Sequence, residues 1–82
     1  MRRRAWRLYH RSLDELAALE IYDEGLILSI DGKVFVEAFL EDGEPRGAVT
    51  VGFMDLEVPF EDAMEAIAEY VNDCVFLREV RD

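Results

Sequence analysis

The residues best suited to chemistry are a single histidine and a single cysteine, His10 and Cys74. These residue types commonly act as base and nucleophile, but a zinc site needs three or four such ligands, so a structural zinc is excluded. No sequence context brings the two together. We therefore expect His10 to be solvated in an arginine-rich segment and Cys74 to be a small core residue, reduced because it has no partner for an internal disulfide.

Carboxylates are the other candidates, with 19 Asp and Glu among 82 residues. A pair of carboxylates can catalyse hydrolysis when their surroundings separate their pKa values, but among so many acids some pair always fits. Asp55 and Glu57 could hold a divalent cation with neighbouring acids, yet no segment matches an EF-hand loop and none is a glycine-rich phosphate loop. We predict no enzymatic role, no cofactor and no metal.

The most informative pattern is the segment FEDAMEAIAEYVND, residues 60–73. At a helical period it places Glu61, Glu65 and Glu69 on one line, with Asp62 and Asp73 beside it and no Lys or Arg among them. Like charges four residues apart repel by about 0.2–0.5 kcal/mol per pair. Successive carboxylates rise by about 6 Å, which is of the order of the spacing between successive phosphates in nucleic acid.

This line of charge suggests a small acidic decoy, a DNA mimic that occupies the Arg/Lys surface of a nucleic-acid-binding protein. Further acids fall in or near predicted turns, where side chains project outward. The predicted partner-binding residues are Glu61, Asp62, Glu65, Glu69, Asp73, Asp55, Glu57, Glu41, Asp42 and Glu44. Opposite charges on the two surfaces would accelerate association.

The charge is unevenly distributed along what we expect to be one domain, residues 1–82. Residues 1–11 form a short basic arm with five Arg and no acid, whereas residues 12–82 carry 4 basic and 19 acidic side chains, a net charge of −15. We expect the arm to contact the acidic body or a neighbouring copy, and no direct binding to nucleic acid or membrane. The acidity is equally compatible with solubility or with a salt-loving host. The expected location is the cytoplasm of a bacterial or archaeal host.

Two elements are expected in the first quarter of the chain. Ser12-Leu-Asp-Glu15 matches a capping box, so a helix should begin there and end between Leu19 and Tyr22. The preceding AWRLYHR alternates like a strand, and an amphipathic extension of the helix is the alternative.

The rest of the chain predicts a hairpin, a third strand, a helix and a last strand. LILSI and KVFVEAFLE flank Asp31-Gly32, which favours a type I′ turn, and AVTVGFM should continue an antiparallel meander. Residues 60–72 predict an amphipathic helix and CVFLREV a final strand. The fold class is therefore α+β, a mostly antiparallel sheet packed by two helices, in the order strand or helix extension, helix, three strands, helix, strand.

Pairing across Asp31-Gly32 without a bulge sets Leu28 opposite Phe35 and Ile27 opposite Val36. Both faces of the hairpin then carry mainly apolar side chains, so each should be covered. Either the two helices cover one face each, or they share a face and leave the other to a second copy or a partner. A homodimeric accessory or structural protein is therefore the alternative to the decoy.

Two resemblances point toward inhibition. In size and acidity the chain is similar to small phage-encoded inhibitors of bacterial defence, including anti-CRISPR proteins. The segment VTVGFMDLEVPFEDAMEAIAEYV resembles the strand-to-helix passage of HicB-type antitoxins, without that family's Gly-Cys and following Gly. The matching residues are Phe53, Asp55, Leu56, Glu61, Asp62, Ala63 and Ala66. The first resemblance implies a CRISPR effector as partner, the second an RNA-cleaving toxin.

Overall fold

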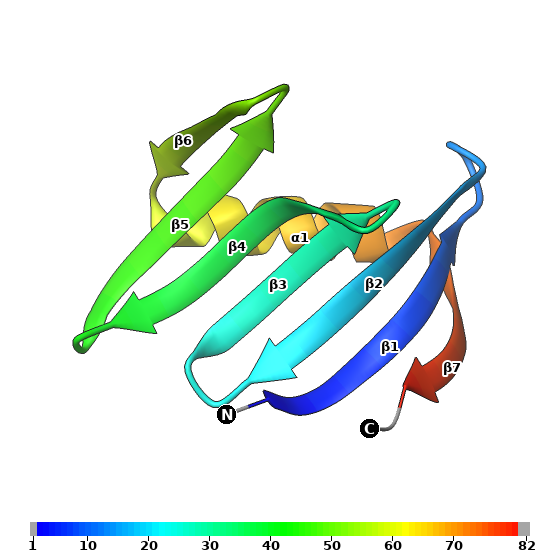
Figure 1. Cartoon of the computed structure of the whole chain (residues 1–82), viewed down its shortest axis with the longest axis horizontal. Coiled ribbons are helices and arrows are strands. Elements are labelled where there is room, and N and C mark those ends of the chain that lie inside the picture. The colour runs from blue at the N-terminus through cyan, green and yellow to red at the C-terminus, as the bar shows by residue number, and fades with distance from the viewer. Residues whose placement is uncertain (1, 81–82) are drawn as a thin grey trace.

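A computed structural model describes residues 2–80, which form one antiparallel sheet and one helix (Figure 1). The elements are β1 (Arg2–His10), β2 (Glu15–Tyr22), β3 (Gly25–Ile30), β4 (Lys33–Glu41), β5 (Glu44–Val51), β6 (Met54–Val58), α1 (Phe60–Asn72) and β7 (Cys74–Val80). The strand order is β6-β5-β4-β3-β2-β1-β7. After six strands joined by tight turns, α1 crosses behind the sheet and returns the chain to β1, which β7 joins (Figure 1).

The predicted helix over residues 12–22 is wrong, and with it the fold class of an α+β domain packed by two helices. Residues 11–14 are the turn of the β1–β2 hairpin, in which Asp14 has a positive φ of 51°. The Ser12 hydroxyl does not cap a helix; it bonds to Asp73 Oδ2 at 3.0 Å. ELAALEIY forms β2 because alternate residues, Ala17 and Leu19, are buried. The observed fold is a seven-stranded sheet with one helix.

The other predicted elements are confirmed, except that one predicted strand is divided into two. The β3–β4 hairpin turns at Asp31-Gly32, α1 covers residues 60–72, and β7 is the predicted last strand. The predicted strand AVTVGFM divides at Gly52, whose φ of 63° permits a tight turn between β5 and β6. The basic segment at the start of the chain is β1, and it lies between β2 and β7.

A β-bulge at Phe35 decides which side chains of β4 reach the helix. Ser29 pairs with Val34 but Leu28 pairs with Val36, which leaves Phe35 as the extra residue. The predicted pairing of Leu28 with Phe35 and of Ile27 with Val36 is therefore wrong by one residue. Since a one-residue shift exchanges the faces of a strand, Val36 joins Leu28 on the helix side.

The helix side of the sheet holds the core. Leu8, Leu28 and Val36 are fully buried there against Ala63, Ile67 and other residues of α1. The helix approaches the sheet closely at Gly47: a Cβ there would lie 2.7 Å from Ala63 Cβ.

The opposite side of the sheet, here called the open face, is not covered by any helix of the described chain, and it mixes polar and apolar side chains. One row of paired positions crosses five strands and reads Glu20, Ile27, Glu37, Ala48 and Glu57. Three of these five side chains are carboxylates. The prediction that both faces of the hairpin are mainly apolar is therefore wrong, because the bulge places Val36 and Ala38 on the helix side and leaves Glu37 on the open face with Ile27.

The contact at Gly47 can be tested with one substitution on each face. Gly47→Val should lower the free energy of unfolding by about 1–3 kcal/mol, since the new side chain must displace α1. Ala48→Val, one residue along β5 but on the open face, should change it far less. Urea denaturation of both variants checks this, and equal losses would contradict the described helix–sheet contact.

Candidate functional site

The outer surface of α1 carries four exposed carboxylates, here called the helix ridge: Glu61, Asp62, Glu65 and Glu69. None forms an ion pair with another residue in the described part of the chain. No Lys or Arg lies in α1. The predicted line of unpaired negative charge therefore stands on the solvent side of the helix.

The position of each acid on α1 decides whether the helix itself stabilises it. Glu61 and Asp62 lie in the first turn, where the positive end of the helix dipole favours a carboxylate. Glu69 lies near the negative end and four residues from Glu65, so both the dipole and the like charge oppose it. The helix itself therefore does not stabilise the negative charges of Glu65 and Glu69.

Asp73, also predicted to bind the partner, has a structural role. Its carboxylate accepts a hydrogen bond from the Ser12 hydroxyl and lies 3.9 Å from His10 Nε2. Its carbonyl accepts one from the backbone N–H of Arg11 at 3.1 Å. These contacts hold the β1–β2 turn against the end of α1, so Asp73 is set apart from the helix ridge.

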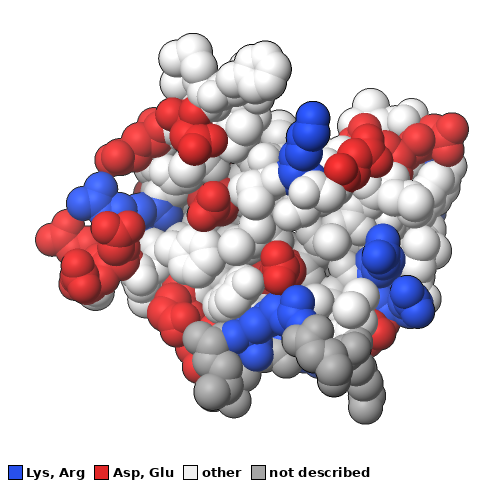
Figure 2. All heavy atoms as spheres, in the orientation of Figure 1, with Lys and Arg blue, Asp and Glu red and all other residues white. Residues whose placement is uncertain are grey.

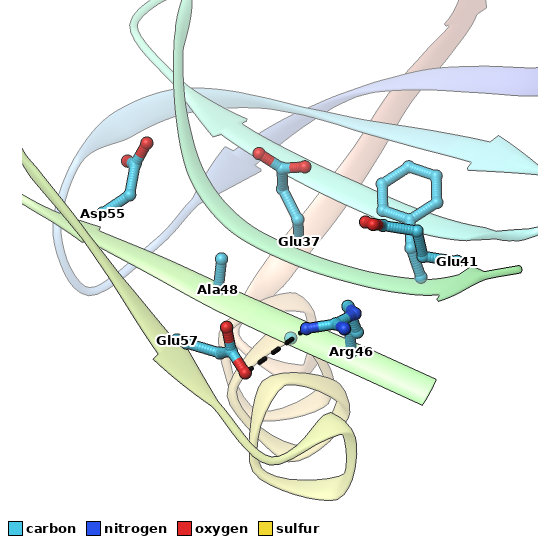
Figure 3. A pocket seen from close by; sticks show the side chains of 8 residues that line it. Glu37, Glu41, Arg46, Ala48, Asp55 and Glu57 are labelled. Atoms are coloured by element: carbon cyan, nitrogen blue, oxygen red, sulfur yellow. Dashed lines mark ion pairs between the residues drawn. The ribbon is translucent and has the colours of Figure 1, made fainter. Parts of the chain in front are cut away.

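A second group of carboxylates lines a shallow hollow of about 340 Å³ on the open face (Figure 3). This open-face cluster consists of Glu37, Glu41, Asp55 and Glu57 around Ala48 and Arg46. Arg46 lies 3.5 Å from Glu57, and Asp55 accepts a hydrogen bond from the Thr50 hydroxyl. The sequence did not single out Glu37, because only the bulge reveals that it shares a face with Asp55 and Glu57.

The ten predicted partner-binding residues therefore do not form one surface. Glu61, Asp62, Glu65 and Glu69 lie on α1, Asp73 follows it, Asp55 and Glu57 lie on the open face, and Glu41, Asp42 and Glu44 lie at the β4–β5 turn. On the open face, acidic groups lie over β4 to β6 with a basic group among them, and further acidic groups lie at the upper right of the view (Figure 2). The helix ridge has no such basic neighbours on its own element.

His10 and Cys74, the candidates for nucleophilic chemistry, are brought together by the sheet. They are direct partners across β1 and β7. His10 is 5% exposed and its ring lies 4.4 Å from that of Tyr70. The expectation of a solvated His10 is therefore wrong, because its side chain packs against Tyr70 of α1.

The arrangement of these two residues does not suit a nucleophile and its base. His10 Nδ1 accepts a hydrogen bond from the Leu13 backbone N–H, and the Cys74 thiol donates to the Tyr70 carbonyl. Burial, followed by the negative charge of Asp73, raises the pKa of the Cys74 thiol. A reactive cysteine needs the opposite shift of its pKa. The hydrogen bonds of His10 and Cys74 instead connect the β1–β2 turn, α1 and β7.

Residues 2–80 include neither a group of metal ligands nor a helix that could span a membrane. No group of three or more His, Cys, Asp or Glu side chains is placed there to hold a metal ion. The same residues include no helix with the length and apolar character needed to cross a membrane. No known family model, curated protein or solved structure matches the chain.

The buried hydroxyl of Tyr70 predicts that the folded protein loses stability at alkaline pH. Burial, followed by the hydrogen bond to Glu15 at 2.8 Å, raises the pKa of the Tyr70 hydroxyl far above its usual range. The unfolded phenol ionises near pH 10, so the folded state holds more protons above that pH and stability falls as pH rises. Tyr70→Phe should flatten this fall between about pH 9 and 11.

Urea denaturation across that pH range measures the effect. Tyr9→Phe is the matched control, since Tyr9 is hydrogen-bonded to Asp14 at an exposed site where solvent weakens the coupling. A Tyr70→Phe variant whose stability falls as steeply as that of the parent would contradict the assignment.

Proposed function

We propose that this protein is an inhibitor that binds a basic, nucleic-acid-binding protein through the helix ridge. The observation that carries the proposal is the set of four exposed carboxylates, without ion pairs to any described residue, on a helix that contains no basic residue. Such a surface attracts the Arg/Lys groove with which the partner grips phosphates, and the opposite charges accelerate encounter. Occupation of that groove would exclude nucleic acid.

The helix ridge suits this role better than the open-face cluster. A carboxylate that is already paired, as Glu57 is with Arg46, gains less from a second cation. Glu61, Glu65 and Glu69 have no described partner and recur at a rise of about 6 Å. They can therefore meet a row of cations without first giving up an internal contact.

Two classes of partner fit this chemistry. One is an effector that binds DNA or RNA, as the resemblance to phage-encoded inhibitors of bacterial defence implies. The other is an RNA-cleaving toxin, as the HicB resemblance implies; its matching residues Glu61, Asp62 and Ala63 lie at the start of α1. In both cases the contact would be a cationic substrate groove facing the helix.

Charge reversal on each acidic surface tests the proposal. The partner is first captured from host lysate at about 50 mM salt, released at about 200 mM salt, identified and purified. The affinity of the purified partner is then measured for the parent chain and for two triple variants. Glu61→Lys/Glu65→Lys/Glu69→Lys should weaken binding about 100-fold, at about 1 kcal/mol for each reversed charge. Glu37→Lys/Asp55→Lys/Glu57→Lys has the same net charge and should change affinity far less.

The inhibitory step has its own measurement. Increasing amounts of the protein should displace labelled nucleic acid from the purified partner, and the helix-ridge variant should not. Unchanged binding by the helix-ridge variant, or a partner that holds nucleic acid and this protein at once, would contradict the proposal.

A further inference from the structure

The sheet ends in two strands that each pair on one side only, at opposite ends of the molecule. Within the described chain, β6 pairs with β5 alone and β7 with β1 alone (Figure 1). The outer backbone N–H and C=O groups of such strands are a template for another strand. Proteins usually protect these edges with charged residues, so the charges along each edge decide what can pair there.

The β7 edge carries positive charge on the open face. Arg78 is the direct partner of Arg7 across β7 and β1, and both side chains are exposed. Neither makes an ion pair with any residue that the structure describes. Like charges directly opposite each other destabilise a sheet, so this edge would gain from a nearby carboxylate.

The β6 edge carries negative charge on the same face. Asp55 and Glu57, both members of the open-face cluster, project from β6 (Figure 3). Arg46 lies near Glu57, but the side chain of Glu57 is still 77% exposed. The two free edges thus have opposite signs on one side of the sheet.

Apolar side chains accompany the charges on both edges. Met54 and Leu56 of β6 are 65% and 45% exposed, and Phe76 and Leu77 of β7 are 45% and 53% exposed. Pairing of one edge with the other would remove part of this surface from water, which favours association. Charge and apolar surface therefore match between the two ends of the same molecule.

We propose that the chain assembles head to tail, with β7 of one copy pairing with β6 of the next. Pairing of β6 with β6 would bring Asp55 and Glu57 against their copies, and pairing of β7 with β7 would do the same for Arg78. The charges thus disfavour both symmetric dimers and favour the unlike pair. An interface between unlike surfaces leaves one edge of each kind free, so it produces a ring or a filament rather than a closed dimer.

Sedimentation velocity over a wide range of protein concentration tests this assembly. The parent chain should form species larger than a dimer. Arg78→Glu alone and Asp55→Arg/Glu57→Arg alone should each raise the dissociation constant at least about tenfold. Glu41→Arg/Glu44→Arg at the β4–β5 turn alters net charge as much as the β6 variant does and should not weaken assembly.

A charge exchange distinguishes a direct contact from general repulsion. A chain carrying Arg78→Glu together with Asp55→Arg and Glu57→Arg should assemble again, because the signs of both edges are exchanged. Circular dichroism establishes that each variant is folded. A monomeric parent, a dimer that does not grow, or a failure of the exchanged chain to assemble would overturn the proposal. The assembly does not involve the helix ridge, so its failure would leave the proposed function standing.

Discussion

The sheet has one helix with which to bury apolar surface, so only one of its faces can be apolar. The helix meets that face through Ala63, Ile67 and Tyr70 and approaches it most closely at Gly47. The bulge at Phe35 makes this possible, since the extra residue places Val36 and Ala38 on the helix side with Leu28. Without it, β4 would turn these side chains to the open face and bring Glu37 to the helix side.

The parts of the fold that the sequence predicts are those with a signal in neighbouring residues. The β3–β4 hairpin, α1 and β7 have strong local signals: a turn dipeptide, a period near 3.6, and a run of β-forming residues. Ser12-Leu-Asp-Glu15 is ambiguous, because residues that cap helices also form turns by bonding to nearby backbone. Its outcome depended on Asp73 and His10, which meet it only after the chain has folded. The bulge has no comparable local signal.

The two acidic surfaces also differ in whether neighbouring residues reveal them. The helix ridge follows from spacing alone, so it was predicted residue by residue. The open-face cluster depends on register across three strands, and Glu37 could not be joined to Asp55 and Glu57 before the bulge was known. The contact between His10 and Cys74 depends on β7 joining β1 after the helix, a long-range pairing that local pattern does not show.

Magnitudes decide whether folding itself accounts for the charges on α1. Burial of a side chain such as Ile67 stabilises by about 1.5–3 kcal/mol, whereas each like-charged pair four residues apart costs about 0.2–0.5 kcal/mol. Packing of the inner face of α1 therefore outweighs the repulsion between carboxylates on its outer face. The helix would form with charges of either sign on the outer face. Solubility would be served as well by a Lys four residues after Glu61 or Glu65, which would also stabilise the helix. The Asp73 carboxylate accepts a hydrogen bond from the Ser12 hydroxyl, whereas Glu65 and Glu69 have no described ion pair, and this difference favours a binding role for the helix ridge over acidity for its own sake.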